Sequence, residues 1–152
     1  MKVALDTNIL AYAEGVNGVE KREIVLDLVR NLPRESAVIP GQVLGELFNV
    51  LTRKAGRPRA DAREALLSWR DAFPVAETTS EIMLTAADLA TDHALSIWDA
   101  VILTIASRAG CRLLVSEDLQ DGFTWGGVTV VNPFASPRHA LLASLLADRG
   151  VG

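Results

Sequence analysis

The chain has 152 residues, of which 49% are hydrophobic, 22% are charged and 5% are aromatic. This composition excludes a disordered or collagen-like chain, and the length is typical of one domain, which we expect over residues 1–152. The formal net charge of −4 argues against a protein that coats nucleic acid by bulk positive charge. It does not exclude an acidic site that collects metal ions.

The sequence gives no sign of a membrane or export segment. No apolar run reaches the roughly 18 residues that a membrane helix needs, and the N-terminal stretch turns acidic at Asp6 before a signal-peptide core could form. A single cysteine, Cys111, excludes an internal disulfide and a cysteine-based zinc site. We therefore expect a cytoplasmic protein without membrane contact.

Short aliphatic runs alternate with segments of helical periodicity. The runs, each bounded by polar, Gly or Pro residues, predict five strands: Val3–Leu5, Ala37–Ile39, Val75–Ala76, Leu113–Val115 and Val128–Val131. The segments between them predict six helices: Asn8–Ala13, Val19–Leu32, Gly41–Arg53, Arg59–Ala72, Ser80–His93 and Ile97–Ala109. This alternation predicts an α/β fold with a mainly parallel sheet and helices on both of its faces.

The C-terminal stretch predicts one more helix, over about residues 136–149. Ser136 is a suitable N-cap and Pro137 a suitable first helical residue. The predicted helix has four leucines on one face: Leu141, Leu142, Leu145 and Leu146. We expect this face to pack either on the domain itself or on a second subunit.

Four carboxylates stand beside apolar neighbours, where a solvated acid is unusual. Asp6 directly follows the first predicted strand, and Asp118 follows the fourth. Glu46 and Asp99 border the apolar stripes of two predicted helices. Each has an ordinary explanation when taken alone. Asp6 can cap the next helix, and Asp99 can form a capping box with Ser96. Glu46 can reach solvent and Asp118 can lie in a solvated loop.

Taken together, the four acids share a position in the predicted fold. Each comes at the carboxyl end of a strand or in the first turns of the helix that follows, and in a parallel sheet these positions lie along one edge. Carboxylates that meet there repel one another and stay ionised at neutral pH only if a cation neutralises them. Oxygen ligands favour Mg²⁺ or Mn²⁺ over zinc, and the two histidines, His93 and His139, do not fit a zinc triad.

A local positive patch interrupts the acidic chain. Five cations fall within eleven residues against one acid, Asp61; they are Arg53, Lys54, Arg57, Arg59 and Arg63. Such a patch fits contact with phosphate groups, and it fits a solvated helix end and turn equally well.

The chain resembles the PIN-domain ribonucleases and, among them, the VapC-type toxins of bacterial and archaeal toxin–antitoxin pairs. The matching segments are VALDTNIL, VLGELFNVL with Glu46, LSIWDAVILTIA with Asp99, and LLVSEDLQDG with Ser116 and Asp118. The resemblance implies a three-layer α/β/α sandwich with a five-stranded sheet and an Mg²⁺-dependent endoribonuclease activity, with Mn²⁺ able to replace Mg²⁺. It also implies a homodimer and a cognate antitoxin that occupies the acidic groove.

The resemblance assigns roles to individual residues. It carries the family's acidic quartet onto Asp6, Glu46, Asp99 and Asp118, with Asp6 and Asp99 as metal ligands. The hydroxyl groups of Thr7 and Ser116 are the expected supports of these acids. The last acidic position stays open, because the fourth segment also offers Glu117 and Asp121.

Two other functions remain as alternatives. A Mg²⁺-dependent phosphatase or receiver-like phosphoacceptor usually needs a lysine near its acids, and the chain has only Lys2, Lys21 and Lys54. A non-catalytic interaction module with a PIN-like fold fits degenerate acidic positions, whereas all four positions hold acids here. The sequence therefore favours a metal-dependent endoribonuclease that acts as the toxin of a toxin–antitoxin pair, and it does not identify the RNA or the antitoxin.

Overall fold

The computed structural model describes residues 1–147. Over these residues the sheet has six strands in the order β3-β2-β1-β4-β6-β5. The five strands that run parallel are β1 (Val3–Leu5), β2 (Ala37–Pro40), β3 (Val75–Ala76), β4 (Leu113–Val115) and β6 (Val128–Val131). The mainly parallel α/β architecture is therefore confirmed. That residues 1–152 form one domain stays a prediction.

The sixth strand, β5 (Thr124–Trp125), was not expected and pairs antiparallel with β6. Gly126 and Gly127 join the two strands, and both have positive φ angles, 58° and 80°. Such a pair forms the tight turn that matches the twist of a hairpin. Unlike Val75–Ala76, the Thr124–Trp125 pair is not an aliphatic run, so only the pairing with β6 reveals this strand.

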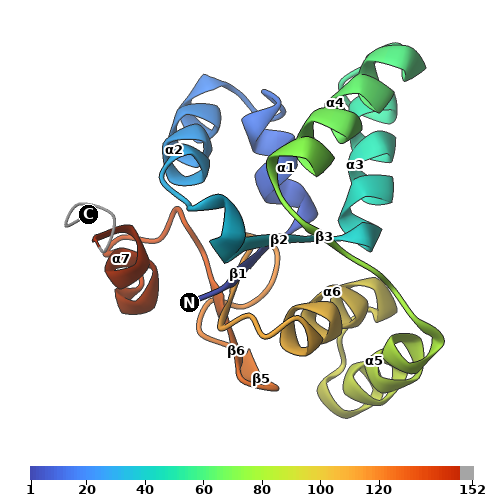
Figure 1. Ribbon diagram of the computed structural model, residues 1–152, viewed down its shortest axis with the longest axis vertical. Coiled ribbons are helices and arrows are strands. Elements are labelled where there is room, and N and C mark those ends of the chain that lie inside the picture. Colours follow the sequence, from blue (N-terminus) through green and yellow to red (C-terminus); the bar gives the residue numbers. More distant parts are fainter. Residues whose placement is uncertain (148–152) are drawn as a thin grey trace.

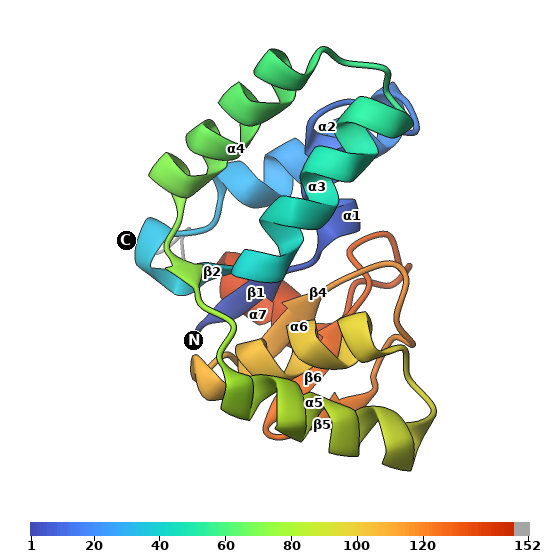
Figure 2. The same cartoon turned by 90° about the vertical axis from the view of Figure 1, so that its right-hand side faces the viewer.

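Seven helices and one short 3-10 turn cover the sheet within the described residues. They are α1 (Thr7–Ala13), α2 (Val19–Arg30), η1 (Arg34–Ser36), α3 (Gly41–Arg53), α4 (Arg59–Ala72), α5 (Ser80–His93), α6 (Ile97–Arg108) and α7 (Ala140–Ala147). Figure 1 shows α2 and α7 on one side of the sheet and α5 and α6 on the other. Helices α3 and α4 pack side by side and extend beyond the sheet in both views (Figure 2).

Helix α6 is largely buried against the sheet. It packs across β2, β4 and β6, and residues Ala100 to Ala106 are all buried. No single helix among residues 1–147 is long and apolar enough to cross a membrane; α5 and α6 meet those criteria only as a pair, bent by 118° at the break between them.

Helix α7 begins later than the sequence predicts. Pro137 is not its first residue, because the helix starts at Ala140 and the Ser136–Pro137 bond is cis. The Nδ1 atom of His139 accepts a hydrogen bond from the Leu141 N–H at 3.1 Å and so takes the capping role expected of Ser136. Leu142 and Leu145 are buried, so this face packs on the chain itself. Residues 148 and 149 of the predicted helix lie outside the described residues.

Candidate active site

The pairing of β1 with β4 brings two site segments together. Leu5 lies opposite Val115 in the parallel register, so the next residues, Asp6 and Ser116, emerge side by side at the carboxyl edge of the sheet. The Ser116 hydroxyl donates a hydrogen bond to Asp6 Oδ2 at 2.7 Å. The Thr7 N–H donates to Asp6 Oδ1, also at 2.7 Å. Asp6 therefore caps α1, as its ordinary explanation required, and is also bound to the residue that follows β4.

Burial changes the acidity of Asp6. The residue is only 4% exposed, and this desolvation raises the pKa of its carboxyl from 3.8 to about 6. The hydrogen bonds from Ser116 and Thr7 oppose the increase, whereas the negative charges of Asp99 and Asp118 add to it. The structure thus places Asp6 within electrostatic reach of two of its expected partners.

Glu46 is directed toward α1 rather than toward open solvent. The Thr7 hydroxyl donates a hydrogen bond to Glu46 Oε2 at 2.5 Å, and Gln42 Nε2 donates to Glu46 Oε1 at 3.2 Å. Gln42 and Glu46 are one helical turn apart on α3, which lets the amide reach the carboxylate. Thr7 and Gln42 therefore hold the Glu46 carboxylate by hydrogen bonds, and the supporting role expected of the Thr7 hydroxyl stays a prediction.

Asp99 lies half-buried in the first turn of α6. Ser96 Oγ accepts a hydrogen bond from the Asp99 N–H at 3.1 Å, so Ser96 caps the helix. Burial raises the pKa of the Asp99 carboxyl, a hydrogen bond with Ser96 lowers it, and the charges of Glu46 and Asp118 raise it further. The capping arrangement expected at this position and the proximity to other acids are both present.

The three acids that the sequence left open for the fourth place in the acidic quartet, Glu117, Asp118 and Asp121, have different partners in the structure. Lys21 Nζ lies 2.7 Å from Glu117 Oε2, and the Tyr12 hydroxyl donates to Glu117 Oε1. Asp121 Oδ1 accepts a hydrogen bond from the Asn132 N–H at 2.8 Å. Asp118 is the acid of this loop whose charge acts on both Asp6 and Asp99, so the geometry favours it for the fourth position.

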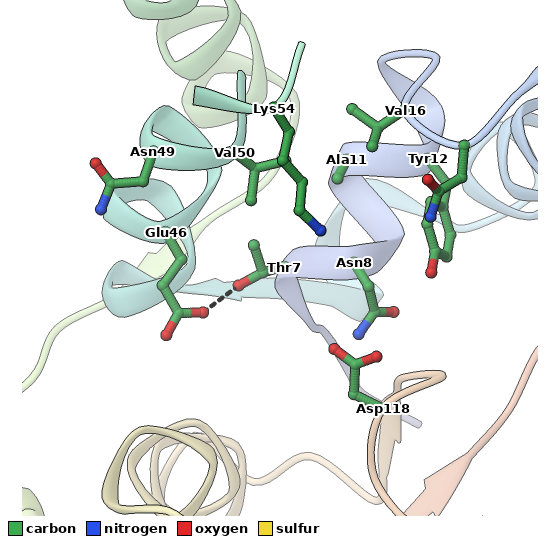
Figure 3. A pocket seen from close by; sticks show the side chains of 11 residues that line it. Thr7, Asn8, Ala11, Tyr12, Val16, Glu46, Asn49, Val50, Lys54 and Asp118 are labelled. Carbon is green, nitrogen blue, oxygen red and sulfur yellow. Dashed lines mark hydrogen bonds between the residues drawn. The ribbon is translucent and has the colours of Figure 1, made fainter. Parts of the chain in front are cut away.

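A cavity of about 410 Å³ opens beside these acids. Glu46 and Asp118 line it together with Thr7, Asn8 and Lys54 (Figure 3). Lys54 comes from the positive patch of the sequence, whereas Asn8 was not among the expected site residues. Asn8 Nδ2 donates to Asp6 Oδ2 at 3.3 Å, and Asn8 Oδ1 accepts from the Glu117 N–H at 3.1 Å. Its place directly after Asp6-Thr7 was the signal that could have identified it as a link between the two segments.

The donor set fits a hard divalent cation. Asp6, Glu46, Asp99 and Asp118 offer oxygen atoms alone, which is the chemistry that Mg²⁺ and Mn²⁺ prefer. Their mutual repulsion is the kind that a bound cation relieves. As the side chains are oriented, no three Asp, Glu, His or Cys residues within 1–147 form a group that could hold an ion. Binding therefore requires the carboxylates to turn toward one another.

Comparison with known proteins establishes the family. The protein-family model of the PIN domain matches residues 3–121 of this chain. Ribonuclease VapC7 of Mycobacterium tuberculosis is 32% identical over 152 residues, which cover 97% of this chain and 99% of that protein. The chain therefore belongs to the PIN-domain family, as a VapC-type ribonuclease toxin, and the resemblance seen in the sequence is confirmed.

Solved structures share the fold at lower identity. A chain of a toxin–antitoxin complex from Klebsiella pneumoniae is 22% identical with a TM-score of 0.66, over 88% of this chain and 98% of that one. Mycobacterium tuberculosis VapC20, described as a toxin that cleaves the sarcin-ricin loop, is 19% identical with a TM-score of 0.64, over 74% of this chain and 87% of that one. At such identities the match establishes the fold alone.

Proposed function

We propose that this chain is a Mg²⁺-dependent endoribonuclease that hydrolyses RNA phosphodiester bonds with Asp6, Glu46, Asp99 and Asp118. One observation supports it above all. Four separate segments, the ends of β1 and β4 and the helices α3 and α6, bring four carboxylates to one edge of the sheet, where the charges of Asp99 and Asp118 act on Asp6 and that of Glu46 acts on Asp99. Such a cluster costs stability unless it serves to bind a cation.

In this proposal Asp6 and Asp99 hold the ion, and Glu46 and Asp118 act directly or through water. A bound Mg²⁺, or Mn²⁺ in its place, supplies a water of lowered pKa and offsets charge on the phosphate. The chain contributes hydrogen bonds that hold the acids near one another before an ion binds: Ser116 and the Thr7 N–H donate to the Asp6 carboxylate, and the Thr7 hydroxyl donates to Glu46. With its pKa at about 6, Asp6 is mostly ionised at neutral pH and can act as a ligand.

The proposed partners are an RNA substrate, a cognate antitoxin protein and a second copy of the chain, in the cytoplasm. The ribonuclease name of the 32% identical relative supports the first. The Klebsiella pneumoniae match, which comes from a toxin–antitoxin complex, supports the second. We propose that the antitoxin covers the acidic cavity, since cationic antitoxin side chains there would neutralise the same carboxylates as a metal ion.

The test is cleavage of total cellular RNA by the purified, antitoxin-free protein, with the new ends sequenced. We expect discrete cuts with Mg²⁺ and none with excess EDTA. Asp99→Asn should lose the cuts, whereas Asp88→Asn, which removes an exposed carboxylate from α5, should keep them. If the folded wild-type protein does not cut RNA in Mg²⁺, the alternative of a non-catalytic interaction module becomes the better reading.

The same assay tests the fourth acid. We expect Asp118→Asn to reduce cleavage strongly and Glu117→Gln to retain most of it, because Glu117 is engaged by Lys21 and Tyr12. The reverse order, with Glu117→Gln inactive and Asp118→Asn active, would move the site to Glu117.

A further inference from the structure

Lys54 stands between two cavities. It is the C-cap residue of α3, and its side chain lines both the cavity of about 410 Å³ that contains Glu46 and Asp118 and a second one of about 400 Å³. The loop residues Gly15 and Asn17 line the second cavity. In Figure 3 the Lys54 amine points into the first cavity, on the side opposite Asp118 and above the first turn of α1.

Lys54 is the one cation among the described residues that line these two cavities. No carboxylate within residues 1–147 forms an ion pair with it. Two other members of the positive patch are engaged elsewhere: Arg57 Nη1 lies 2.7 Å from Glu14 Oε1, and the Arg59 guanidinium lies 5.7 Å from the centre of the Phe48 ring. An unpaired cation therefore remains where the two cavities meet.

The second cavity repels an anion only weakly, although the acid Glu14 lines it. Its one acid, Glu14, has both carboxylate oxygens occupied, because Arg57 binds Oε1 and Trp69 Nε1 donates to Oε2 at 3.1 Å. Arg57 offsets the Glu14 charge. Within residues 1–147 the acids of the first cavity, Glu46 and Asp118, form no ion pair, and Lys54 is the cation in the cavity lining that an RNA strand would meet there.

We propose that Lys54 binds a backbone phosphate next to the one that is cleaved, and that the RNA strand continues past Lys54 into the second cavity. This inference rests on the proposed function, since it places the cleaved phosphate at the acids. The flanking position follows because Lys54 faces the cavity from the side opposite Asp118, so its charge is offset from the carboxylates that hold the metal. Lys54 is then a substrate-binding residue.

The test measures binding of a fluorescent single-stranded RNA oligonucleotide by anisotropy over a series of NaCl concentrations. Excess EDTA prevents metal-dependent cleavage and removes Mg²⁺ as a competing cation. We compare the wild type with Lys54→Gln, Lys54→Arg and Lys2→Gln. Lys2 precedes β1 and so lies at the opposite edge of the parallel sheet, which makes it a control for the loss of one charge.

We expect Lys54→Gln to bind roughly 3- to 10-fold more weakly at low salt, and the slope of log K against log salt to become shallower by about 0.7, the value for one phosphate contact with a single strand. Lys54→Arg should retain both values, and Lys2→Gln should match the wild type. In cleavage assays with Mg²⁺, Lys54→Gln should raise KM while kcat stays within about twofold, because the contact is made equally before and during the reaction.

Other results overturn the inference. A wild-type affinity and salt slope for Lys54→Gln would show that this amine binds no phosphate. A lower kcat with unchanged binding would show that Lys54 acts on the carboxylates instead. If the wild type binds no RNA in EDTA, where bare carboxylates repel it, the KM in Mg²⁺ decides, and a wild-type KM for Lys54→Gln would exclude the proposed path. A wild-type protein that binds RNA but never cleaves it would defeat the proposed function alone, since the salt slopes would still decide the role of Lys54.

Discussion

The buried carboxylate of Asp6 should make the metal-free protein more stable in mild acid than at neutral pH. Burial raises its pKa from 3.8 to about 6, so the folded state binds the proton more tightly than the unfolded state does. The stabilisation from this proton is complete below the unfolded pKa and is lost as the pH rises through the folded one. Between pH 5 and pH 7 the loss amounts to about 1 kcal/mol, out of a total of about 3 kcal/mol.

Asp6→Asn isolates this effect. The amide cannot ionise, although it disturbs the hydrogen bonds from Ser116 and Asn8 by an amount that does not depend on pH in this range. The assay is urea unfolding in excess EDTA at pH 5, 6 and 7. Relative to the wild type, the free energy of unfolding of Asp6→Asn should rise by about 1 kcal/mol from pH 5 to pH 7. The same comparison for Asp88→Asn is the control.

A difference between Asp6→Asn and the wild type that stays constant, or falls, from pH 5 to pH 7 would refute the reasoning. It would mean that the folded protein does not disfavour the charge on Asp6. The remaining acid of the cluster with a raised pKa, Asp99, changes stability in the same direction, so the wild-type curve alone overstates the part due to Asp6.

Three further predictions concern the same cluster. Asp99→Asn should abolish cleavage yet raise the Tm in EDTA, because it removes one of the repelling charges; a clearly lower Tm would show that Asp99 serves as part of the helix cap alone. Ser116→Ala should lower stability by about 1–3 kcal/mol in urea unfolding and weaken cleavage, since the buried hydroxyl binds Asp6 and the Asp118 N–H; unchanged values of both would contradict this. Mg²⁺ should raise the Tm of the wild type by thermal melting and have little effect on Asp6→Ala; an equal rise in both proteins would place the ion elsewhere.

Much of the sheet edge could be predicted from the sequence because the ends of the strands follow from local patterns. Val3–Leu5 and Leu113–Val115 are short aliphatic runs that end in polar residues, and parallel strands place such ends at one edge. Asp6 and Ser116 therefore had predictable positions. The position of Asp99 was also predictable, because its spacing from Ser96 fixes where α6 begins. Each of these inferences needed only neighbouring residues.

The choices that depend on distant residues could not be made from the sequence. Glu117, Asp118 and Asp121 lie in one loop, and only the partners of Glu117 and Asp121 leave Asp118 for the cluster. Those partners, Lys21 and Asn132, are 96 and 11 positions away. The positive patch presents the same difficulty.

The sequence does not distinguish the five cations of that patch from one another. Tertiary contacts decide which of them enters the cavity. Arg57 reaches Glu14, 43 positions away in the chain, and Arg59 lies over a ring on α3. Lys54 is left to line the cavities. Tertiary contact also decides the start of α7, where His139 provides the cap that the Ser136-Pro137 pair was expected to provide.

Direct binding of a divalent ion tests the role of the acidic cluster. Mn²⁺ is the probe, because its free form is quantified by electron paramagnetic resonance in the presence of the purified protein. We expect the wild type and Asp88→Asn to bind Mn²⁺ with equal affinity, Mg²⁺ to compete for the same site, and Asp6→Ala and Asp99→Ala to lose binding by at least about tenfold. Mn²⁺ binding that is unchanged in folded Asp6→Ala and Asp99→Ala would contradict a metal site at these carboxylates.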